Sequence, residues 1–218
     1  MNKKFWKNKK VFITGHNGFK GSWLSIWLTE LGSKVTGYSL KPNTEPSLFE
    51  TCFLDGKLNS VIGDIRDYEK LKKTITAVQP DIVIHMASQA LVLQSYENPI
   101  ETYQTNLMGT VNILNAIRDI SSIKVFINVT SDKCYENNDS LKAFKEGDAM
   151  GGFDPYSSSK GCSELITASY RSSFFNDTVS IATARAGNII GGGDWALNRI
   201  IPDFIKKINQ NEKLSIRN

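Results

Sequence analysis

A tyrosine and a lysine in the second half of the chain have the spacing of a proton-transfer pair. Tyr156 and Lys160 lie four residues apart, just after Pro155, in a segment with a helical pattern. This spacing places both side chains on one face of a helix. A free tyrosine has a pKa of about 10, and a neighbouring ammonium favours the phenolate form. The pair is therefore suited to take a proton from a hydroxyl while a hydride leaves the same carbon.

Polar residues follow the predicted strand Lys124–Thr130. Ser131, Asp132 and Lys133 come directly after it. A turn accounts for the serine and the aspartate, but ligands of parallel α/β sheets bind at the carboxyl ends of the strands. We expect Ser131 to hydrogen-bond the hydroxyl that Tyr156 deprotonates. A Tyr-x-x-x-Lys pair alone also describes a surface contact; with this serine and a glycine turn upstream, it indicates an oxidoreductase-type site.

The glycine turn lies near the start of the chain. Val11–Thr14 reads as a buried strand, glycines follow at positions 15, 18 and 21, and an apolar helical pattern comes next. Gly15 supplies the tight turn, Gly18 the close approach of a pyrophosphate to the helix amides, and Gly21 the packing of helix on strand. The spacing is a variant of the dinucleotide fingerprint. Glycines also mark ordinary turns, but this position between strand and helix favours nucleotide binding.

Strand and helix patterns alternate along the whole chain, which predicts an α/β fold with a doubly wound parallel sheet of the Rossmann type. A helix follows Gly21, and the segments Leu40–Lys57 and Glu136–Asp154 read as loops. The other predicted helices are Tyr68–Val78, Pro99–Ile117 and Pro155–Phe174; the other predicted strands are Lys34–Tyr38, Asn59–Gly63, Ile82–Met86 and Val179–Ala186.

The remaining strand ends leave alternatives open. Gly37–Lys41 contains no acidic residue to hold a ribose 2′-hydroxyl, so NAD and NADP are both compatible, and Lys41 favours a phosphate. Asp64 and Ile65 suit the edge of an adenine, although an aspartate here also suits a helix cap. The residues His85–Ser88 are mostly small; they either let a cofactor pass or simply form a tight strand exit.

Composition narrows the function classes. The 218 residues carry a net charge of +4, mostly from a lysine run before the first strand that reads as a solvated lead-in, not a nucleic-acid arm. No stretch reaches the length of a membrane span. Three widely spaced cysteines predict reduced thiols in a cytoplasmic protein, and two histidines do not indicate a metal site.

Together these residues resemble the extended short-chain dehydrogenase/reductase superfamily. Within it, four stretches look like the family of CDP-glucose 4,6-dehydratases, and most other nucleotide-sugar dehydratases carry Asp-Glu where this chain has Asp132-Lys133. The four stretches are Val11–Leu24, Thr130–Asn137, Met150–Cys162 and Arg185–Ala196.

The resemblance implies a dehydration that uses NAD without consuming it. Tyr156, assisted by Lys160 and Ser131, helps to oxidise carbon 4 of the glucose ring to a ketone. The ketone acidifies the proton at carbon 5, and water is lost across carbons 5 and 6. Asp132 protonates the leaving hydroxyl, and Lys133 helps at carbon 5. The hydride then returns to carbon 6, which gives CDP-4-dehydro-6-deoxy-D-glucose.

The resemblance also implies binding residues and an assembly. Asn106 supports the active-site helix, and helices Pro99–Ile117 and Pro155–Phe174 suit a homodimer. Ile166 and Tyr170 allow such an interface but equally suit burial on the sheet. The expected cofactor-binding residues are Gly15, Asn17, Gly18, Phe19, Lys20, Tyr38, Ser39, Asp64, Ile65, His85, Ala87, Ser88, Asn106, Thr130, Tyr156 and Lys160. The expected substrate-binding residues are Ser131, Asn188, Asp194, Trp195 and Arg199.

Residues 1–187 are expected to form the NAD-binding domain, and residues 188–218 the beginning of an incomplete substrate domain, since relatives continue for about a hundred residues more. Two alternatives to the dehydratase remain. One is a nucleotide-sugar 4-epimerase or reductase of the same superfamily, against which Asp132-Lys133 argues. The other is an inactive nucleotide-binding fragment.

Overall fold

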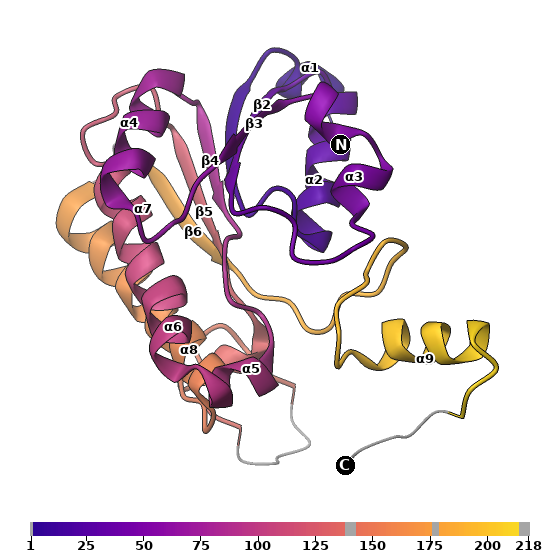
Figure 1. Cartoon of the computed structure of the whole chain (residues 1–218). Coiled ribbons are helices and arrows are strands. Elements are labelled where there is room, and N and C mark those ends of the chain that lie inside the picture. Colours follow the sequence, from indigo (N-terminus) through magenta and orange to yellow (C-terminus); the bar gives the residue numbers. More distant parts are fainter. Residues whose placement is uncertain (1, 138–142, 176–178, 214–218) are drawn as a thin grey trace.

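The six strands of the computed structural model form one parallel sheet in the order β3-β2-β1-β4-β5-β6. The structure describes residues 2–137, 143–175 and 179–213, so the predicted loop Glu136–Asp154 and the segment 188–218 lie partly outside it. Helices cover both faces of the sheet, as Figure 1 shows, and the predicted fold class is confirmed. The strands are β1 (Lys10–Thr14), β2 (Lys34–Ser39), β3 (Asn59–Ile62), β4 (Ile82–His85), β5 (Val125–Val129) and β6 (Ser180–Ala184).

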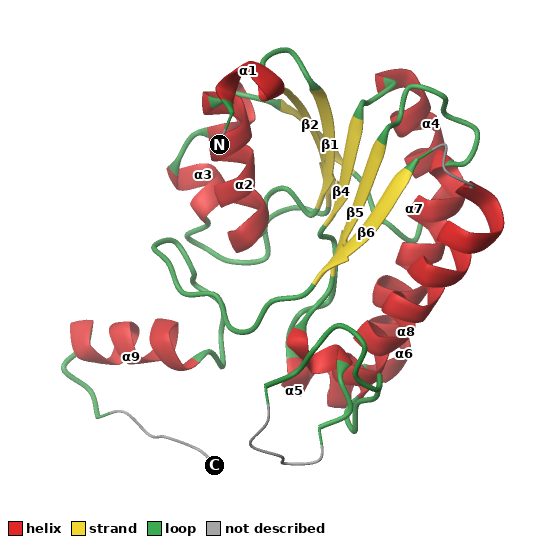
Figure 2. Cartoon of the chain, turned by 180° about the vertical axis from the view of Figure 1, so that it is seen from behind, coloured by secondary structure: helices red, strands yellow, loops and turns green. Residues whose placement is uncertain are grey.

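The helices divide between the two faces. Figure 2, from behind, shows α2 and α3 on one side of the strands and α4, α7 and α8 on the other. The helix bounds are α1 (Lys3–Trp6), α2 (Phe19–Glu30), α3 (Leu48–Thr51), α4 (Tyr68–Val78), α5 (Val92–Glu97), α6 (Pro99–Tyr103), α7 (Gly109–Ile117), α8 (Pro155–Tyr170) and α9 (Ile200–Asn209).

Strand β1 is buried on both faces, which explains its unbroken apolar run. Phe12 points into a core that β1 shares with α4 and α7, where Leu71 and Ile113 are fully buried. Val11 and Ile13 point to the opposite face, into a smaller core with Leu28 of α2 and Val35 of β2. Because successive side chains of a strand alternate between faces, both faces of a central strand must be apolar.

Several predicted elements differ from the structure in informative ways. The predicted loop Leu40–Lys57 contains α3, which begins with a serine N-cap that the sequence analysis overlooked. The Ser47 hydroxyl accepts a hydrogen bond from the Glu50 amide at 3.2 Å and donates to the Glu50 carboxylate at 2.7 Å. Helices α1, α5 and α9 were not predicted either. The two long predicted helices contain π-helical turns at Gln104–Met108 and Arg171–Phe175.

The segment after β6 crosses the carboxyl ends of the strands toward α2. The indole nitrogen of Trp23 donates to the carbonyl of Gly192 at 2.9 Å, and Gly193, with φ +81°, packs on Leu48. This loop leads into α9, none of whose described residues is buried. Among the residues that the structure describes, every helix is too short or too polar to span a lipid bilayer.

The packing of the first turn on β2 predicts a sharp glycine requirement. A Cβ at Gly37 would lie 2.1 Å from the buried His16 ring, so Gly37→Ala must displace the ring and is expected to cost about 1–3 kcal/mol of unfolding free energy. Thermal unfolding measures this as a fall of about 2–4 °C per kcal/mol. Gly147→Ala, which meets no described atom within 4 Å, is the control. Equal midpoints for both variants would contradict the packing.

Candidate functional site

The turn after β1 is held against the exit of β4 by one hydroxyl. Thr14 Oγ1 accepts the amides of Met86 and Ala87, both at 3.1 Å, and lies 2.7 Å from His85 Nδ1. Because two amides already donate to this oxygen, its own proton goes to His85. Gly15 adopts φ +73°, and a Cβ there would lie 2.7 Å from the Ala87 amide nitrogen. Both the conformation and the space therefore require glycine.

The other two glycines differ in what surrounds them. A Cβ at Gly21 would lie 2.0 Å from the carbonyl oxygen of Gly15, so this position is filled by the protein itself. A Cβ at Gly18 would make only an ordinary contact, at 3.5 Å. Gly18 is the N-cap of α2, and no described side chain caps the helix. The positive end of α2 is thus open to an anion, which fits a pyrophosphate.

The end of β2 is organised by short polar contacts. Ser39 donates to Asn17 Oδ1 at 2.7 Å, and Asn17 donates to the carbonyl of Leu40 at 2.5 Å. The Tyr38 ring is fully buried, and its hydroxyl donates to the carbonyl of Asp64 at 3.0 Å. Burial raises the pKa of Tyr38 to about 12. Tyr38 therefore supports this corner from below.

The Asp64 carboxylate is engaged in an ion pair. It forms a 2.6 Å contact with Arg66, and this hydrogen-bonded contact holds the pKa of Asp64 below its usual range. The cap of α4 is Asp67, which accepts from the Lys70 amide. Asp64 is therefore not the cap of α4, which was the alternative role considered for an aspartate at this position. Ile65 is buried against Gly109, where a Cβ would lie 2.8 Å from its side chain.

Asn106 connects the exit of β4 to α8. Its Oδ1 accepts from the Ser88 hydroxyl at 2.9 Å and from the Gln89 amide at 2.8 Å. Its Nδ2 donates to the carbonyl of Gln89 at 3.0 Å and to the Ser159 hydroxyl at 2.9 Å. Asn106 lies in the π-helical turn Gln104–Met108, and such turns re-aim side chains at functional sites. These contacts fit the implied support of the active-site helix.

His85, the last residue of β4, is buried between Thr14 and Thr110, and a hydroxyl faces each of its ring nitrogens. Nδ1 faces Thr14, and Nε2 lies 3.4 Å from the Thr110 hydroxyl. Complete burial, with a contribution from Lys160, lowers the pKa of His85 to about 3. The structure therefore uses His85 as a neutral internal link and leaves no ring nitrogen for a cofactor.

Tyr156 and Ser131 meet at the start of α8. Asp154 caps this helix by accepting the Ser157 amide at 2.9 Å, and the Tyr156 amide donates to Ser95 Oγ at 3.2 Å. Ser131 lies close enough to the Tyr156 phenol to lower its pKa by a hydrogen-bonding interaction. The serine at the end of β5 and the tyrosine of the helix therefore lie at the same place, as a shared substrate hydroxyl would require; the role of Ser131 toward that hydroxyl stays a prediction.

The pKa of Tyr156 moves in the opposite direction from the one that the sequence analysis expected. Burial is the largest effect and raises the pKa, while the hydrogen bond to Ser131 and the charge of Arg199 lower it. Lys160, one turn along the helix, is buried; burial and the charge of Lys20 lower its pKa to about 8. The i, i+4 spacing showed that Tyr156 and Lys160 share a helix face. It could not show that both side chains are buried, and burial disfavours the charged form of each.

Asp132 and Lys133 begin a short 3₁₀ turn, Asp132–Cys134. Ser131 caps it by accepting the Lys133 amide at 3.2 Å, and its hydroxyl donates to Asp132 Oδ1 at 3.0 Å. The Asp132 charge acts on Tyr156, so this carboxylate lies at the same site. The Lys133 side chain is exposed. Cys134, at the end of the turn, is buried.

Some of the predicted substrate residues converge on this site. Arg199 pairs with Asp194 at 3.3 Å, and its charge acts on both Tyr156 and Lys20. Trp195 contributes its backbone carbonyl to Lys206 at 3.0 Å. Asn188 is exposed on the loop. The cations Arg199, Lys20 and Lys160 thus form a positive cluster near Tyr156.

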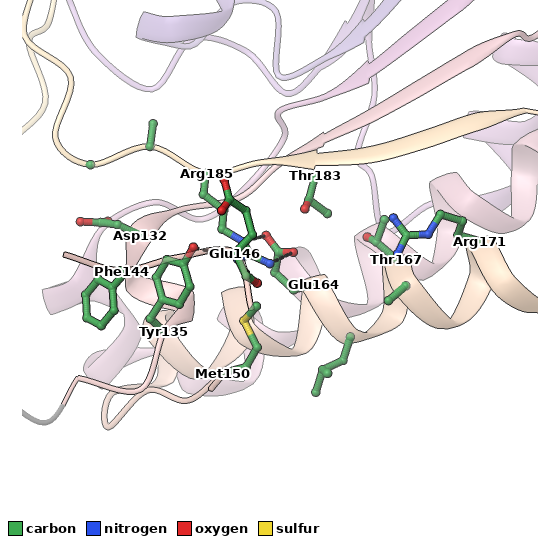
Figure 3. A pocket seen from close by; sticks show the side chains of 14 residues that line it. Asp132, Tyr135, Phe144, Glu146, Met150, Glu164, Thr167, Arg171, Thr183 and Arg185 are labelled. Atoms are coloured by element: carbon green, nitrogen blue, oxygen red, sulfur yellow. Dashed lines mark hydrogen bonds and ion pairs between the residues drawn. The ribbon is translucent and has the colours of Figure 1, made fainter. Parts of the chain in front are cut away.

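Sequence analysis missed a buried ion pair beside the site. Arg185 donates to both carboxylate oxygens of Glu164 at 2.9 Å, and Thr130 also donates to Glu164. Arg185 and Glu164 line a cavity of about 580 Å³ that Asp132 borders (Figure 3). The available signal was the spacing, because Glu164 lies four residues after Lys160 on α8 and so shares its helix face.

Comparisons with known proteins agree with this geometry. The chain is 53% identical, over its whole length, to CDP-glucose 4,6-dehydratase of Salmonella typhimurium and spans 62% of that relative. The UDP-glucose 4-epimerase structure of Brucella ovis, in complex with NAD, matches 83% of this chain and 52% of its own, with 27% identity and a TM-score of 0.70.

A third comparison supports the fold alone. The dTDP-glucose 4,6-dehydratase structure of Bacillus anthracis, in complex with NAD, matches 94% of this chain and 63% of its own, with 22% identity and a TM-score of 0.80.

The sequence profile of the GDP-mannose 4,6 dehydratase family matches residues 12–217. With a match that extends from β1 to beyond α9, the chain belongs to the GDP-mannose 4,6 dehydratase family.

Proposed function

We propose that the protein is an NAD-dependent dehydratase that converts CDP-D-glucose to CDP-4-dehydro-6-deoxy-D-glucose and water. The observation that carries this proposal is that Ser131 and Asp132 both lie close enough to Tyr156 to shift its pKa, with Lys160 one turn further along α8. An epimerase also needs Ser131, Tyr156 and Lys160, but its reaction has no leaving hydroxyl for an acid such as Asp132 to protonate. The 53% identity to a CDP-glucose 4,6-dehydratase supports the same substrate.

We propose residues 1–187 as the NAD-binding domain and residues 188–218 as the beginning of a substrate-binding domain. The open α2 terminus at Gly18 suits the pyrophosphate, and the polar corner of Asn17 and Ser39 suits the adenosine ribose. NAD supplies an acceptor that takes a hydride from carbon 4 and returns it to carbon 6. The remaining expected contacts are Phe19, Lys20, Asp64, Ile65, Ala87, Ser88, Asn106 and Thr130, whereas the buried Tyr38 and His85 would support the site from within the protein.

The chain's own residues move the protons. Tyr156 takes the proton of the carbon 4 hydroxyl, which Ser131 orients, and the Lys160 ammonium stabilises the charge that develops on the phenol. Asp132 delivers a proton to the carbon 6 hydroxyl as it leaves. Lys133 assists removal of the carbon 5 proton, and a proton goes back to carbon 5 when the hydride is added at carbon 6. Net loss of one water balances the reaction.

Substrate and assembly follow from the remaining surfaces. The positive cluster around Arg199 suits the diphosphate of a nucleotide sugar, with Asn188, Asp194 and Trp195 beside it. The helix face formed by α6, α7 and α8 exposes Ile100, Met108 and Leu165, and we propose that it forms a homodimer. Ile166 and Tyr170, which suited either an interface or burial on the sheet, pack against the core. The three free cysteines support a cytoplasmic location.

Tyr156→Phe is expected to lower turnover of CDP-glucose by about 10²–10⁴-fold, because it removes the group that exchanges the proton. Formation of the 4-keto product, followed by its absorbance in base, measures this. Tyr170→Phe removes the same atom from the same helix and should leave turnover unchanged. Equal rates for the native and Tyr156→Phe proteins would exclude the assigned base. A product that retains oxygen at carbon 6 would indicate an epimerase instead.

Gly18→Ala separates cofactor binding from folding. The added methyl makes only an ordinary protein contact, at 3.5 Å, so the unfolding midpoint should hardly change. A pyrophosphate at this turn would collide with the methyl, and we expect NAD affinity to fall at least tenfold by calorimetry, roughly 1.4 kcal/mol. Gly147→Ala serves as the control. Undiminished affinity would mean that the cofactor does not lie on this turn.

Leu165→Lys tests the dimer. Leu165 is 61% exposed on α8, so a lysine is tolerated in a monomer but would place a charge within the proposed interface. Sedimentation equilibrium should show a dimer for the native protein and a shift toward monomer for the variant. Trp27→Lys, on the opposite face of the sheet, should remain dimeric. A native protein that sediments as a monomer would rule out the assembly.

A further inference from the structure

Glu164 is a buried carboxylate whose hydrogen-bond partners come from the ends of two neighbouring strands, β5 and β6. It lies on α8, one turn after Lys160, and is 5% exposed. It accepts hydrogen bonds from Thr130 at the end of β5 and from Arg185 just beyond β6. Thr183 of β6 lies close enough to lower the pKa of the Glu164 carboxyl as well. A carboxylate shared by a helix and two strand ends fixes their relative positions.

Arg185 extends this contact toward the segment that follows Asp132. It donates to the Tyr135 hydroxyl at 2.8 Å and to the carbonyl of Glu146 at 3.1 Å. Its guanidinium lies 4.9 Å from the centre of the Tyr135 ring, which stacks on Phe144 at 4.6 Å. Figure 3 shows Glu164 and Arg185 in the wall of the cavity, between Tyr135 and Thr183.

The strand exit that carries Ser131 is held on both sides by the same group of contacts. The Thr130 amide donates to the carbonyl of Ala184 at 2.9 Å, and the Asp132 amide donates to the carbonyl of Ala186 at 3.1 Å. These backbone bonds attach the exit of β5 to that of β6. Among the described contacts, the Glu164 carboxylate joins both exits to α8, which carries Tyr156.

We propose that Glu164, together with Arg185, is a positioning pair that holds Ser131 and Asp132 against the tyrosine of α8. This inference rests on the proposed dehydratase function. Among the contacts of the described residues, the pair touches neither Tyr156 nor the expected substrate positions, so it acts through the residues that it orients. Its removal should impair the chemical step more than substrate binding.

Glu164 also acts on Lys160 by charge. The ionisable groups that act on Lys160 are Lys20 from α2, Glu164 from α8 and Cys134 from the 3₁₀ turn. Lys20 lowers the pKa of Lys160, and Glu164 raises it. Loss of the Glu164 charge therefore lowers the pKa of Lys160 below about 8, and the ammonium is lost at a lower pH.

The experiment compares Glu164→Gln and Glu164→Asp with the native protein. Glutamine keeps the shape and removes the charge; aspartate keeps the charge and shortens the reach. We expect both variants to lower kcat at least tenfold with a smaller change in KM for CDP-glucose. The basic limb of the kcat/KM pH profile should move to lower pH for glutamine only. Glu69→Gln, on the exposed surface of α4, is the control.

Two readouts do not require turnover. Magnetic resonance titration of labelled lysines should show a lower Lys160 pKa in Glu164→Gln, and hydrogen exchange should accelerate at the amides of residues 131–135 in both variants. If these changes occur but native protein forms no product from CDP-glucose, the proposed function fails and the positioning contact stands. Folded variants with native kcat, exchange and Lys160 titration would overturn the inference.

Discussion

The structure depends on the hydrogen bonds that satisfy polar side chains buried between the strand ends and α8. Polar groups are costly to bury without partners, and here each one constrains the next. Thr14 donates to His85, whose Nε2 faces Thr110. The Thr110 hydroxyl donates to the carbonyl of Asn106, so it accepts from Ser163. One arrangement of protons satisfies this chain of contacts, which links the glycine turn to α8.

This constraint explains why the two halves of the candidate site lie at a fixed separation. The glycine turn belongs to β1, whereas Tyr156 and Lys160 belong to a helix more than a hundred residues later. No ion pair joins them directly in the described part of the chain. His85, held neutral by burial that lowers its pKa to about 3, transmits the position of one to the other. A charged imidazole there would have a donor facing the Thr14 proton.

The sequence predicted what depends on local pattern and missed what depends on tertiary contacts. The glycine turn, the six strands and the bounds of α4 follow from alternation and spacing. The π-helical turn around Asn106 does not, because it accompanies hydrogen bonds to Gln89 and Ser159 that are distant in sequence. The raised pKa of Tyr156 could not be predicted either, because it results from burial that only the folded structure shows. Glu164 was accessible from spacing, but its partner Arg185 was recognisable only in three dimensions.

The cations of the candidate site, Lys20, Lys160 and Arg199, influence one another's charge. Burial lowers the pKa of Lys20 and of Lys160; Arg199 lowers that of Lys20 further, and Lys20 that of Lys160. Cations that lower one another's pKa bind protons more weakly than they would beside an anion. A diphosphate in the crevice would reverse this effect, and by reciprocity protonation strengthens its binding. The positive cluster is therefore less stable alone than it would be beside an anionic ligand.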